Sequence, residues 1–111
     1  MIKKLIFLYP NFFLDKDFER WGVKYYLERN VNIEIWNILG IINKKAFKEN
    51  NIYQKENKNI KIIRLQNFEN FKNLLISQPK DSIFIAPMNI SYENQLIFKE
   101  LQKQKKIWGP Y

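Results

Sequence analysis

The stretch Lys4-Leu-Ile-Phe-Leu-Tyr9 decides the fold, because it is almost wholly apolar and has the length of one strand before Pro10-Asn11 ends it. An apolar run without polar alternation fits a strand that is covered on both faces. Strands of that kind belong mainly to parallel sheets with helices on either side. The sequence therefore predicts a buried first strand in an α/β domain.

Further apolar runs continue this pattern along the chain. They predict strands over residues 31–39, 60–65, 82–86 and 107–108. The first of them, Val31–Leu39, alternates between polar and apolar residues and then becomes apolar, as expected for a strand that enters a core.

Helical patterns separate the predicted strands. A helix from Asp17 to about Asn30, capped by Asp15 or Asp17, is expected to bury Trp21 and Tyr25 against the sheet. The other helices are predicted around residues 43–49, from Asn67 to just before Pro79, and from Asn89 or Ser91 to about Lys105 with Leu96 facing inward.

Alternation of strands and helices predicts one Rossmann-like domain, with a mostly parallel five-stranded sheet and helices on both faces. Right-handed crossovers and the long connection after the second strand favour the order 3-2-1-4-5, and the order 2-1-3-4-5 stays open. A chain of 111 residues holds one such domain, spanning 1–111.

Composition and missing motifs exclude several functions. With no Cys and no His, the chain offers no thiol nucleophile, no imidazole base and no zinc site built on either residue. Neither Gly-x-Gly-x-x-Gly nor Gly-Lys-Ser/Thr is present, so dinucleotide and P-loop phosphate binding have no support. Tyr9-Pro10 also stands where a phosphoacceptor domain needs an acidic pair. No metal and no cofactor are predicted.

The chain is basic, with 19 Lys and Arg against 11 Asp and Glu and a formal charge of +8. Only Arg20, Arg29 and Arg64 carry the guanidinium that suits bidentate contacts to bases. The lysines are spread over the connection 44–58 and the region 99–106. We therefore expect no specific nucleic-acid partner, and at most weak attraction to an anionic membrane surface.

Polar and aromatic residues follow the first and fourth strands, where the strand order reverses and ligands bind in open parallel sheets. Amides, hydroxyls and aromatic rings suit neutral sugars or polyols through hydrogen bonding and stacking. The predicted ligand-binding residues are Tyr9, Asn11, Asn89, Ser91 and Tyr92. Helix capping is the simpler explanation for Asn89 and Ser91.

Asp15 and Asp17 are the candidate catalytic residues, since either carboxylate would lie close enough to the same strand ends to act as a general base. Acidic residues are also common in the first turn of a helix without any catalytic role, and capping accounts for both of them.

Three segments carry a family resemblance: the strand from Lys3 to Pro10, Asp15-Lys-Asp-Phe-Glu-Arg-Trp-Gly-Val-Lys-Tyr-Tyr26, and Asn32-Ile-Glu-Ile-Trp-Asn37. Together they resemble the start of GT-B-type glycosyltransferases from bacterial surface-polysaccharide pathways, and the resemblance covers roughly the whole chain. In that family two Rossmann-like domains face each other across a cleft. The amino-terminal domain mainly holds the acceptor, and the carboxyl-terminal domain mainly holds the nucleotide-sugar.

The resemblance implies an acceptor-side domain whose partners are a missing carboxyl-terminal domain, a sugar acceptor and a nucleotide-sugar donor, with transfer needing no dedicated metal. The chain departs from the family by lacking the second domain and the glycine-rich turn after the first strand. It is therefore expected to be inactive alone. The alternative is a free-standing flavodoxin-like or Rossmann-like module for protein binding or regulation.

The amino terminus places two lysines before an apolar run, as secretory signals do, but the run breaks at Pro10-Asn11 without a small-residue cleavage site. The expected location is the cytoplasm, with contact to the inner membrane surface left open.

Overall fold

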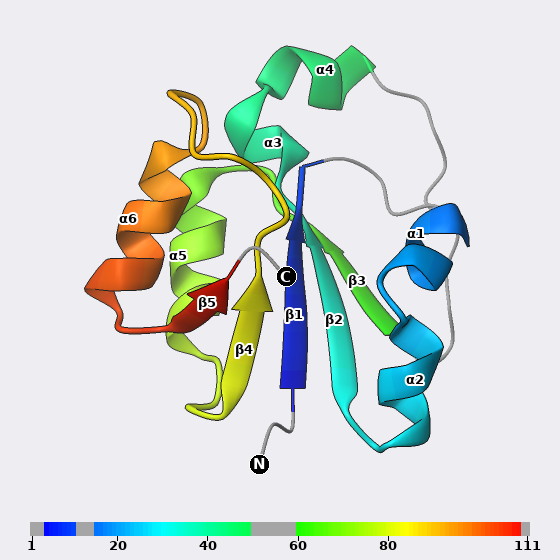
Figure 1. Cartoon of the computed structure of the whole chain (residues 1–111). Helices are drawn as coiled ribbons and strands as arrows, with labels where there is room; N and C mark the ends of the chain where they lie inside the picture. Colours follow the sequence, from blue (N-terminus) through cyan, green and yellow to red (C-terminus); the bar gives the residue numbers. More distant parts are fainter. Residues whose placement is uncertain (1–3, 11–14, 50–59, 110–111) are drawn as a thin grey trace.

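The computed structural model describes residues 4–10, 15–49 and 60–109, which form one parallel sheet with helices around it (Figure 1). The strands are β1 (Lys4–Tyr9), β2 (Asn32–Asn37), β3 (Ile60–Arg64), β4 (Ser82–Ile85) and β5 (Ile107–Gly109). Their order is β3-β2-β1-β4-β5, and every pairing is parallel. This confirms the predicted Rossmann-like fold and the central position of β1, and it excludes the order 2-1-3-4-5.

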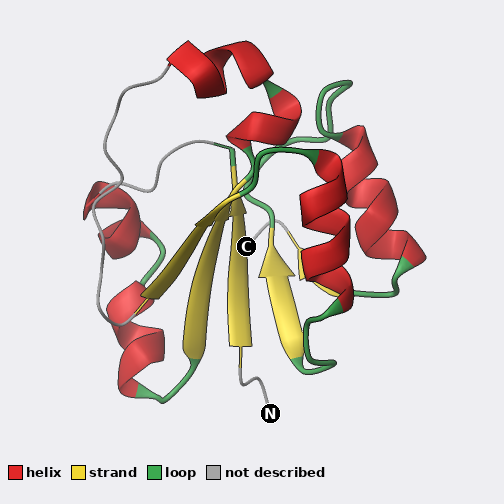
Figure 2. Ribbon diagram, turned by 180° about the vertical axis from the view of Figure 1, so that it is seen from behind, coloured by secondary structure: helices red, strands yellow, loops and turns green. Residues whose placement is uncertain are grey.

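The helices lie on both faces of the sheet and beyond the carboxyl ends of its strands. They are α1 (Asp15–Arg20), α2 (Val23–Glu28), α3 (Leu39–Ile42), α4 (Lys44–Glu49), α5 (Phe68–Ile76) and α6 (Gln95–Lys103). Figures 1 and 2 show α1 and α2 on one side of the sheet and α5 and α6 on the other, while α3 and α4 lie beyond the carboxyl ends of the strands.

The side chains of β1 supply both hydrophobic layers. Leu5 and Phe7 belong to a cluster that includes Val23 of α2, whereas Ile6 and Leu8 belong to the cluster beneath α5 and α6. All four β1 side chains are at most 4% exposed. Burial of each contributes roughly 1.5–3 kcal/mol relative to exposure, so a strand of this composition is stable only with helices on both faces.

Trp36 is the largest fully buried side chain and fills the layer beneath α5 and α6. Its ring meets the rings of Phe71 and Phe84 edge-on, with centroids 6.1 and 5.6 Å away. Burial requires a partner for the indole N–H, which donates to Glu34 Oε1 over 3.0 Å.

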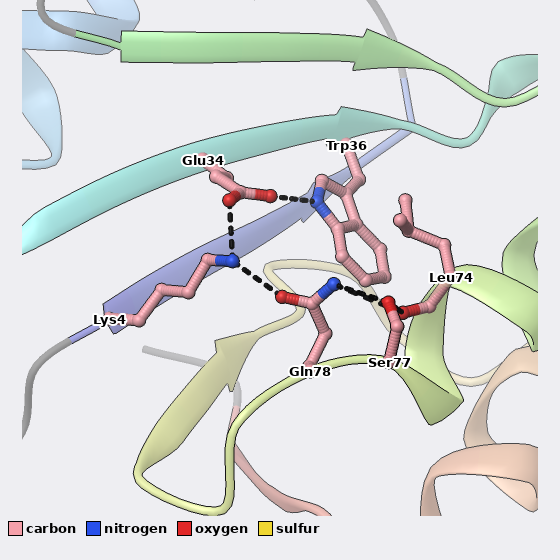
Figure 3. A network of polar contacts seen from close by, with 6 residues as sticks. All are labelled: Lys4, Glu34, Trp36, Leu74, Ser77 and Gln78. Carbon is pink, nitrogen blue, oxygen red and sulfur yellow. Dashed lines mark hydrogen bonds and ion pairs between the residues drawn. The ribbon is translucent and has the colours of Figure 1, made fainter.

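Glu34 is in turn held by Lys4, as Figure 3 shows. Lys4 Nζ lies 2.5 Å from Glu34 Oε2 and donates to Gln78 Oε1 over 2.6 Å. Gln78 Nε2 donates to the carbonyl oxygen of Leu74, near the end of α5. The network therefore joins β1 and β2 to α5 while satisfying a buried carboxylate.

The predicted continuous helix from Asp17 to Asn30 is wrong, because the chain breaks into α1 and α2 at Gly22. Gly22 has φ +63°, a left-handed conformation that glycine adopts without steric cost. The break turns Tyr25 outward: its side chain is 55% exposed, and the Arg29 guanidinium lies 3.5 Å from its ring centroid. Trp21 is partly buried and packs on Phe7, with ring centroids 5.9 Å apart.

The predicted start of the last helix is also wrong. Helix α6 begins at Gln95 with Asn94 as its N-cap residue, so neither Asn89 nor Ser91 caps it. The later start changes which residues face the sheet: Ile97, Phe98 and Leu101 are buried, whereas Leu96 is 53% exposed.

Strand β2 ends at Asn37, two residues before the predicted end at Leu39, and the chain turns directly into α3. Gly40 allows this helix to lie against the chain after β3, because a Cβ at this position would stand 2.5 Å from the Leu65 carbonyl oxygen. None of the helices in the described part of the chain is long and apolar enough to cross a membrane.

Gly40→Ala is expected to destabilise the domain by about 1–3 kcal/mol, the range for overpacking against groups that cannot move freely. Gly109→Ala is the matched control, since nothing lies within 4 Å of its added Cβ. Urea denaturation of both variants measures the difference, and equal midpoints would contradict the close approach of α3.

Lys4→Met is expected to cost about 3 kcal/mol, because Glu34 and Gln78 lose a partner in a largely buried setting. Lys24→Met removes the exposed pair Lys24–Glu28, whose atoms are 4.0 Å apart, and should cost less than about 0.5 kcal/mol. Equal free energies of unfolding for the two variants would show that the buried network contributes no special stability.

Candidate functional site

Polar side chains form a row across the carboxyl ends of three neighbouring strands. Tyr9 of β1 pairs with Asn37 of β2, and Asn37 pairs with Arg64 of β3. Two positions earlier on the same strands are Phe7, Ile35 and Ile62, which pack in the layer beneath α1 and α2. Side chains two apart on a strand share one face of the sheet. The row Tyr9–Asn37–Arg64 therefore lies on the face that α1 and α2 cover.

Tyr9 and Asp17, two of the residues singled out from the sequence, are in contact. The Tyr9 hydroxyl donates to Asp17 Oδ1 over 2.8 Å, and Asp17 is only 4% exposed. Burial, the hydrogen bond to Asp17 and the charge of that carboxylate raise the pKa of Tyr9 above its ordinary value of 10.0, in that order of importance. Trp21 and Arg20 act in the opposite direction and lower it.

Asn37 combines a satisfied acceptor with an unsatisfied donor. Its Oδ1 accepts the backbone N–H of Leu39 over 2.9 Å, which fixes the amide at the start of α3. Its side chain is 1% exposed, and its Nδ2 has no hydrogen-bond partner within the described structure. An unsatisfied buried donor costs about 1–3 kcal/mol, so this group is the most unusual polar atom of the row.

Arg64 places a cation at the β3 end of the row. Its side chain is exposed, and its guanidinium lies 4.5 Å from the ring centroid of Phe47 in α4. The exposed lysines of α4 lie on the same short helix, beyond the carboxyl edge in Figure 1: Lys44, Lys45 and Lys48. This end of the row is therefore positively charged, whereas the Tyr9 end carries both the Asp17 carboxylate and the Arg20 cation that lowers the pKa of Tyr9.

Asn89, Ser91 and Tyr92 lie in a separate group. Asn94 organises their segment, because its Oδ1 accepts the N–H of Ser91 over 2.7 Å and its Nδ2 donates to the carbonyl oxygen of Asn89 over 2.9 Å. Asn89 and Ser91 are exposed, and Tyr92 is 86% exposed. Figures 1 and 2 show this segment leaving β4 and turning over the end of α6, on the opposite side of the sheet from α1.

The structure does not describe the side chains of two other predicted site residues. Asn11 lies outside the described residues, and so does the side chain of Asp15, the first residue of α1. Within the described ranges, no group of three or more His, Cys, Asp or Glu side chains could hold a metal ion.

The sequence prediction missed Asn37 and Arg64. It applied the carboxyl-edge rule only to the first and fourth strands, and it extended the second strand past Asn37 through Ile38-Leu39. One signal in the sequence could have identified the row. Each of the first three apolar runs has a polar residue at its end: Tyr9, Asn37 and Arg64.

Comparisons with models of protein families, with curated proteins and with solved structures find no match to this chain.

The Asp17→Asn substitution should lower the pKa of Tyr9 toward 10, because it removes the charge that opposes phenolate formation. NMR titration of the Tyr9 ring carbons in both proteins measures this directly. An unchanged titration midpoint would show that Asp17 does not act on Tyr9.

The raised pKa also predicts a pH dependence of stability. A pKa that is higher in the folded than in the unfolded state adds stability below pH 10, and this contribution is lost as pH rises through the folded-state pKa. Asp17→Asn should therefore flatten the fall in the free energy of unfolding above pH 10. A fall of equal steepness in both proteins would contradict the assignment to Tyr9.

Proposed function

We propose that this domain binds a sugar at the carboxyl end of β1, as the acceptor-side domain of a GT-B-like glycosyltransferase in bacterial surface-polysaccharide synthesis. The observation that carries the proposal is the contact between Tyr9 and the buried Asp17 carboxylate at the end of the central strand. The strand order β3-β2-β1-β4-β5 supports it, because open parallel sheets bind ligands beyond these strand ends.

The chemistry of the pair suits a hydroxyl-rich ligand. Because the Tyr9 hydroxyl donates its hydrogen bond to Asp17, its oxygen would meet a sugar hydroxyl as an acceptor. The partly buried ring of Tyr9 is of the kind that stacks on sugars. Asp17 is almost fully buried and acts in this proposal as a positioning residue for Tyr9, rather than as the general base.

Transfer would need a second domain that holds the nucleotide-sugar. The chain has no glycine-rich turn to bind the donor's phosphates. Orienting two substrates in one closed cleft can supply about 7–11 kcal/mol of barrier reduction, which one wall of a cleft cannot provide. The proposal therefore assigns acceptor binding, and not catalysis, to the isolated chain.

A specific observation favours the alternative of a protein-binding module. Ile90 and Leu96 are 66% and 53% exposed, and Tyr92 lies between them in sequence with 86% exposure. Exposed apolar side chains that gather in one segment are typical of protein contacts. In this alternative the segment before α6 is the functional surface and the row on β1–β3 is structural.

NMR titration of the isolated chain with simple methyl glycosides tests the proposal. We expect millimolar binding, which corresponds to roughly −4 kcal/mol, with amide shifts around Tyr9 and Asn37. Tyr9→Phe should abolish the shifts, since the phenol oxygen is the proposed acceptor, and Tyr25→Phe on the outer side of α2 should leave them unchanged.

The same titration discriminates between the two functions. Shifts confined to residues 89–96, or no shifts at all, would contradict sugar binding at β1. Micromolar binding of UDP-, GDP- or CMP-sugars by the isolated chain would contradict the assignment of the donor to a second domain.

A further inference from the structure

We propose that helix α6 and the segment before it rest on an anionic membrane surface. The contact is made by what we call the α6 surface, which consists of Ile90, Tyr92, Leu96, Lys99 and Lys103. Figures 1 and 2 show α6 on the opposite face of the sheet from α1 and α2. The proposal therefore goes beyond the sugar site and does not depend on it.

Apolar side chains gather at the amino end of α6. Half of the large hydrophobic side chains that are exposed in the described part of the chain lie here: Ile90, Tyr92 and Leu96. Figure 1 shows the segment before α6 projecting past the start of the helix. Asn94, which is only 5% exposed, holds this segment to the helix by accepting the N–H of Ser91. The apolar side chains are therefore presented to solvent from a turn that hydrogen bonds fix.

Lysines continue the same surface along the helix. Lys99 and Lys103 follow Leu96 at spacings of three and seven residues, so the three side chains share one helix face. Both lysines are exposed, and neither forms an ion pair with a residue that the structure describes. Two more lysines, Lys105 and Lys106, follow directly after the helix. The α6 surface is therefore apolar at its amino end and cationic at its carboxyl end.

The carboxylates near the α6 surface do not cancel its charge. Glu100 belongs to α6 but is buried, and its Oε2 accepts a hydrogen bond from Gln104 over 2.7 Å. Glu93 is exposed at the apolar end. Together these two carboxylates offset only two of the four lysines between residues 99 and 106. On α5, the neighbouring helix, the exposed Glu69 is followed three residues later by Lys72. The net charge of this side of the molecule is therefore positive.

This combination of side chains fits a lipid surface better than a protein or a nucleic acid. Protein interfaces are depleted in lysine and enriched in arginine. A nucleic acid would account for the lysines but not for the exposed Ile90, Tyr92 and Leu96. Tyrosine is enriched where a bilayer meets water, because its ring is apolar and its hydroxyl is polar. Lysines add an attraction to anionic lipid headgroups.

The dimensions of α6 allow the apolar and cationic parts to act together. With a rise of about 1.5 Å per residue, Lys103 lies about 10 Å along the helix from Leu96. This distance is close to the Debye length of about 8–10 Å near physiological ionic strength. A bilayer that takes up the apolar side chains therefore also attracts both lysines of the helix.

Co-sedimentation of the full chain with lipid vesicles tests the proposal. Vesicles of phosphatidylcholine mixed with phosphatidylglycerol should bind the chain about 25-fold more tightly than phosphatidylcholine alone, since two lysines near an anionic bilayer contribute about fivefold each. Equal binding to both kinds of vesicle would overturn the proposal. Absence of binding to either would also overturn it, would favour the alternative of a protein partner, and would leave the sugar site intact.

Lysine variants locate the charge effect. The double substitution Lys99→Gln and Lys103→Gln should weaken binding to the anionic vesicles about 25-fold. The matched control is Lys16→Gln with Lys24→Gln, which removes the same charge from two exposed lysines of α1 and α2 on the other face of the sheet. The control should change binding less than about twofold, because screening limits the attraction to charges near the bilayer. Equal losses in both proteins would show a general effect of net charge and would contradict the α6 surface.

A tyrosine variant separates a membrane from other polyanions. Tyr92→Ala should weaken binding to the anionic vesicles severalfold, because the affinity of a peripheral contact grows with the apolar area that enters the bilayer. Tyr25→Ala is the matched control, since Tyr25 is also exposed but lies on α2. Both side chains are on the outside, so circular dichroism should show both variants folded. Undiminished binding by Tyr92→Ala would overturn the membrane assignment, because charge alone would then explain the attraction.

A nitroxide on the lipid headgroup shows which face touches the membrane. In bicelles that contain phosphatidylglycerol and the labelled lipid, the amide NMR signals of residues 90–103 should broaden more than those of α1 and α2. Broadening centred on α1 and α2 would overturn the proposal.

Discussion

The central strand must be apolar on both faces, and the rest of the structure depends on this requirement. Leu5 and Phe7 need a cover on one side of the sheet, and Ile6 and Leu8 need one on the other. Helices α1 and α2 supply the first cover and α5 and α6 the second, with β2 and β4 pairing on either side of β1. Glu34 is a polar group that enters one of these layers with partners, Lys4 and Trp36.

The same parallel pairing creates the candidate site. Parallel strands end at one edge, so the last residues of β1, β2 and β3 meet there in register. Gly40 lets α3 lie close to that edge, and the N–H of Leu39 in this helix fixes the Asn37 amide. The candidate site is therefore a consequence of the register and of a small residue, Gly40, in the helix that follows β2.

The strands and their order could be predicted from the sequence, because five apolar runs and right-handed crossovers leave few arrangements. The N-cap Asn67 was also predictable, and its Oδ1 accepts the N–H of Asn70. The break at Gly22 could not be predicted, because one glycine in a helical pattern is compatible both with one weakened helix and with two separate helices. Ile38-Leu39 continued an apolar run, which hid the end of β2 and with it the role of Asn37.

A crystal structure of the domain grown with a methyl glycoside tests the central claim most directly. The account predicts a sugar hydroxyl within hydrogen-bond distance of the Tyr9 phenol oxygen, with Tyr9 still bonded to Asp17. A ligand bound instead to the segment from Asn89 to Tyr92 would contradict it.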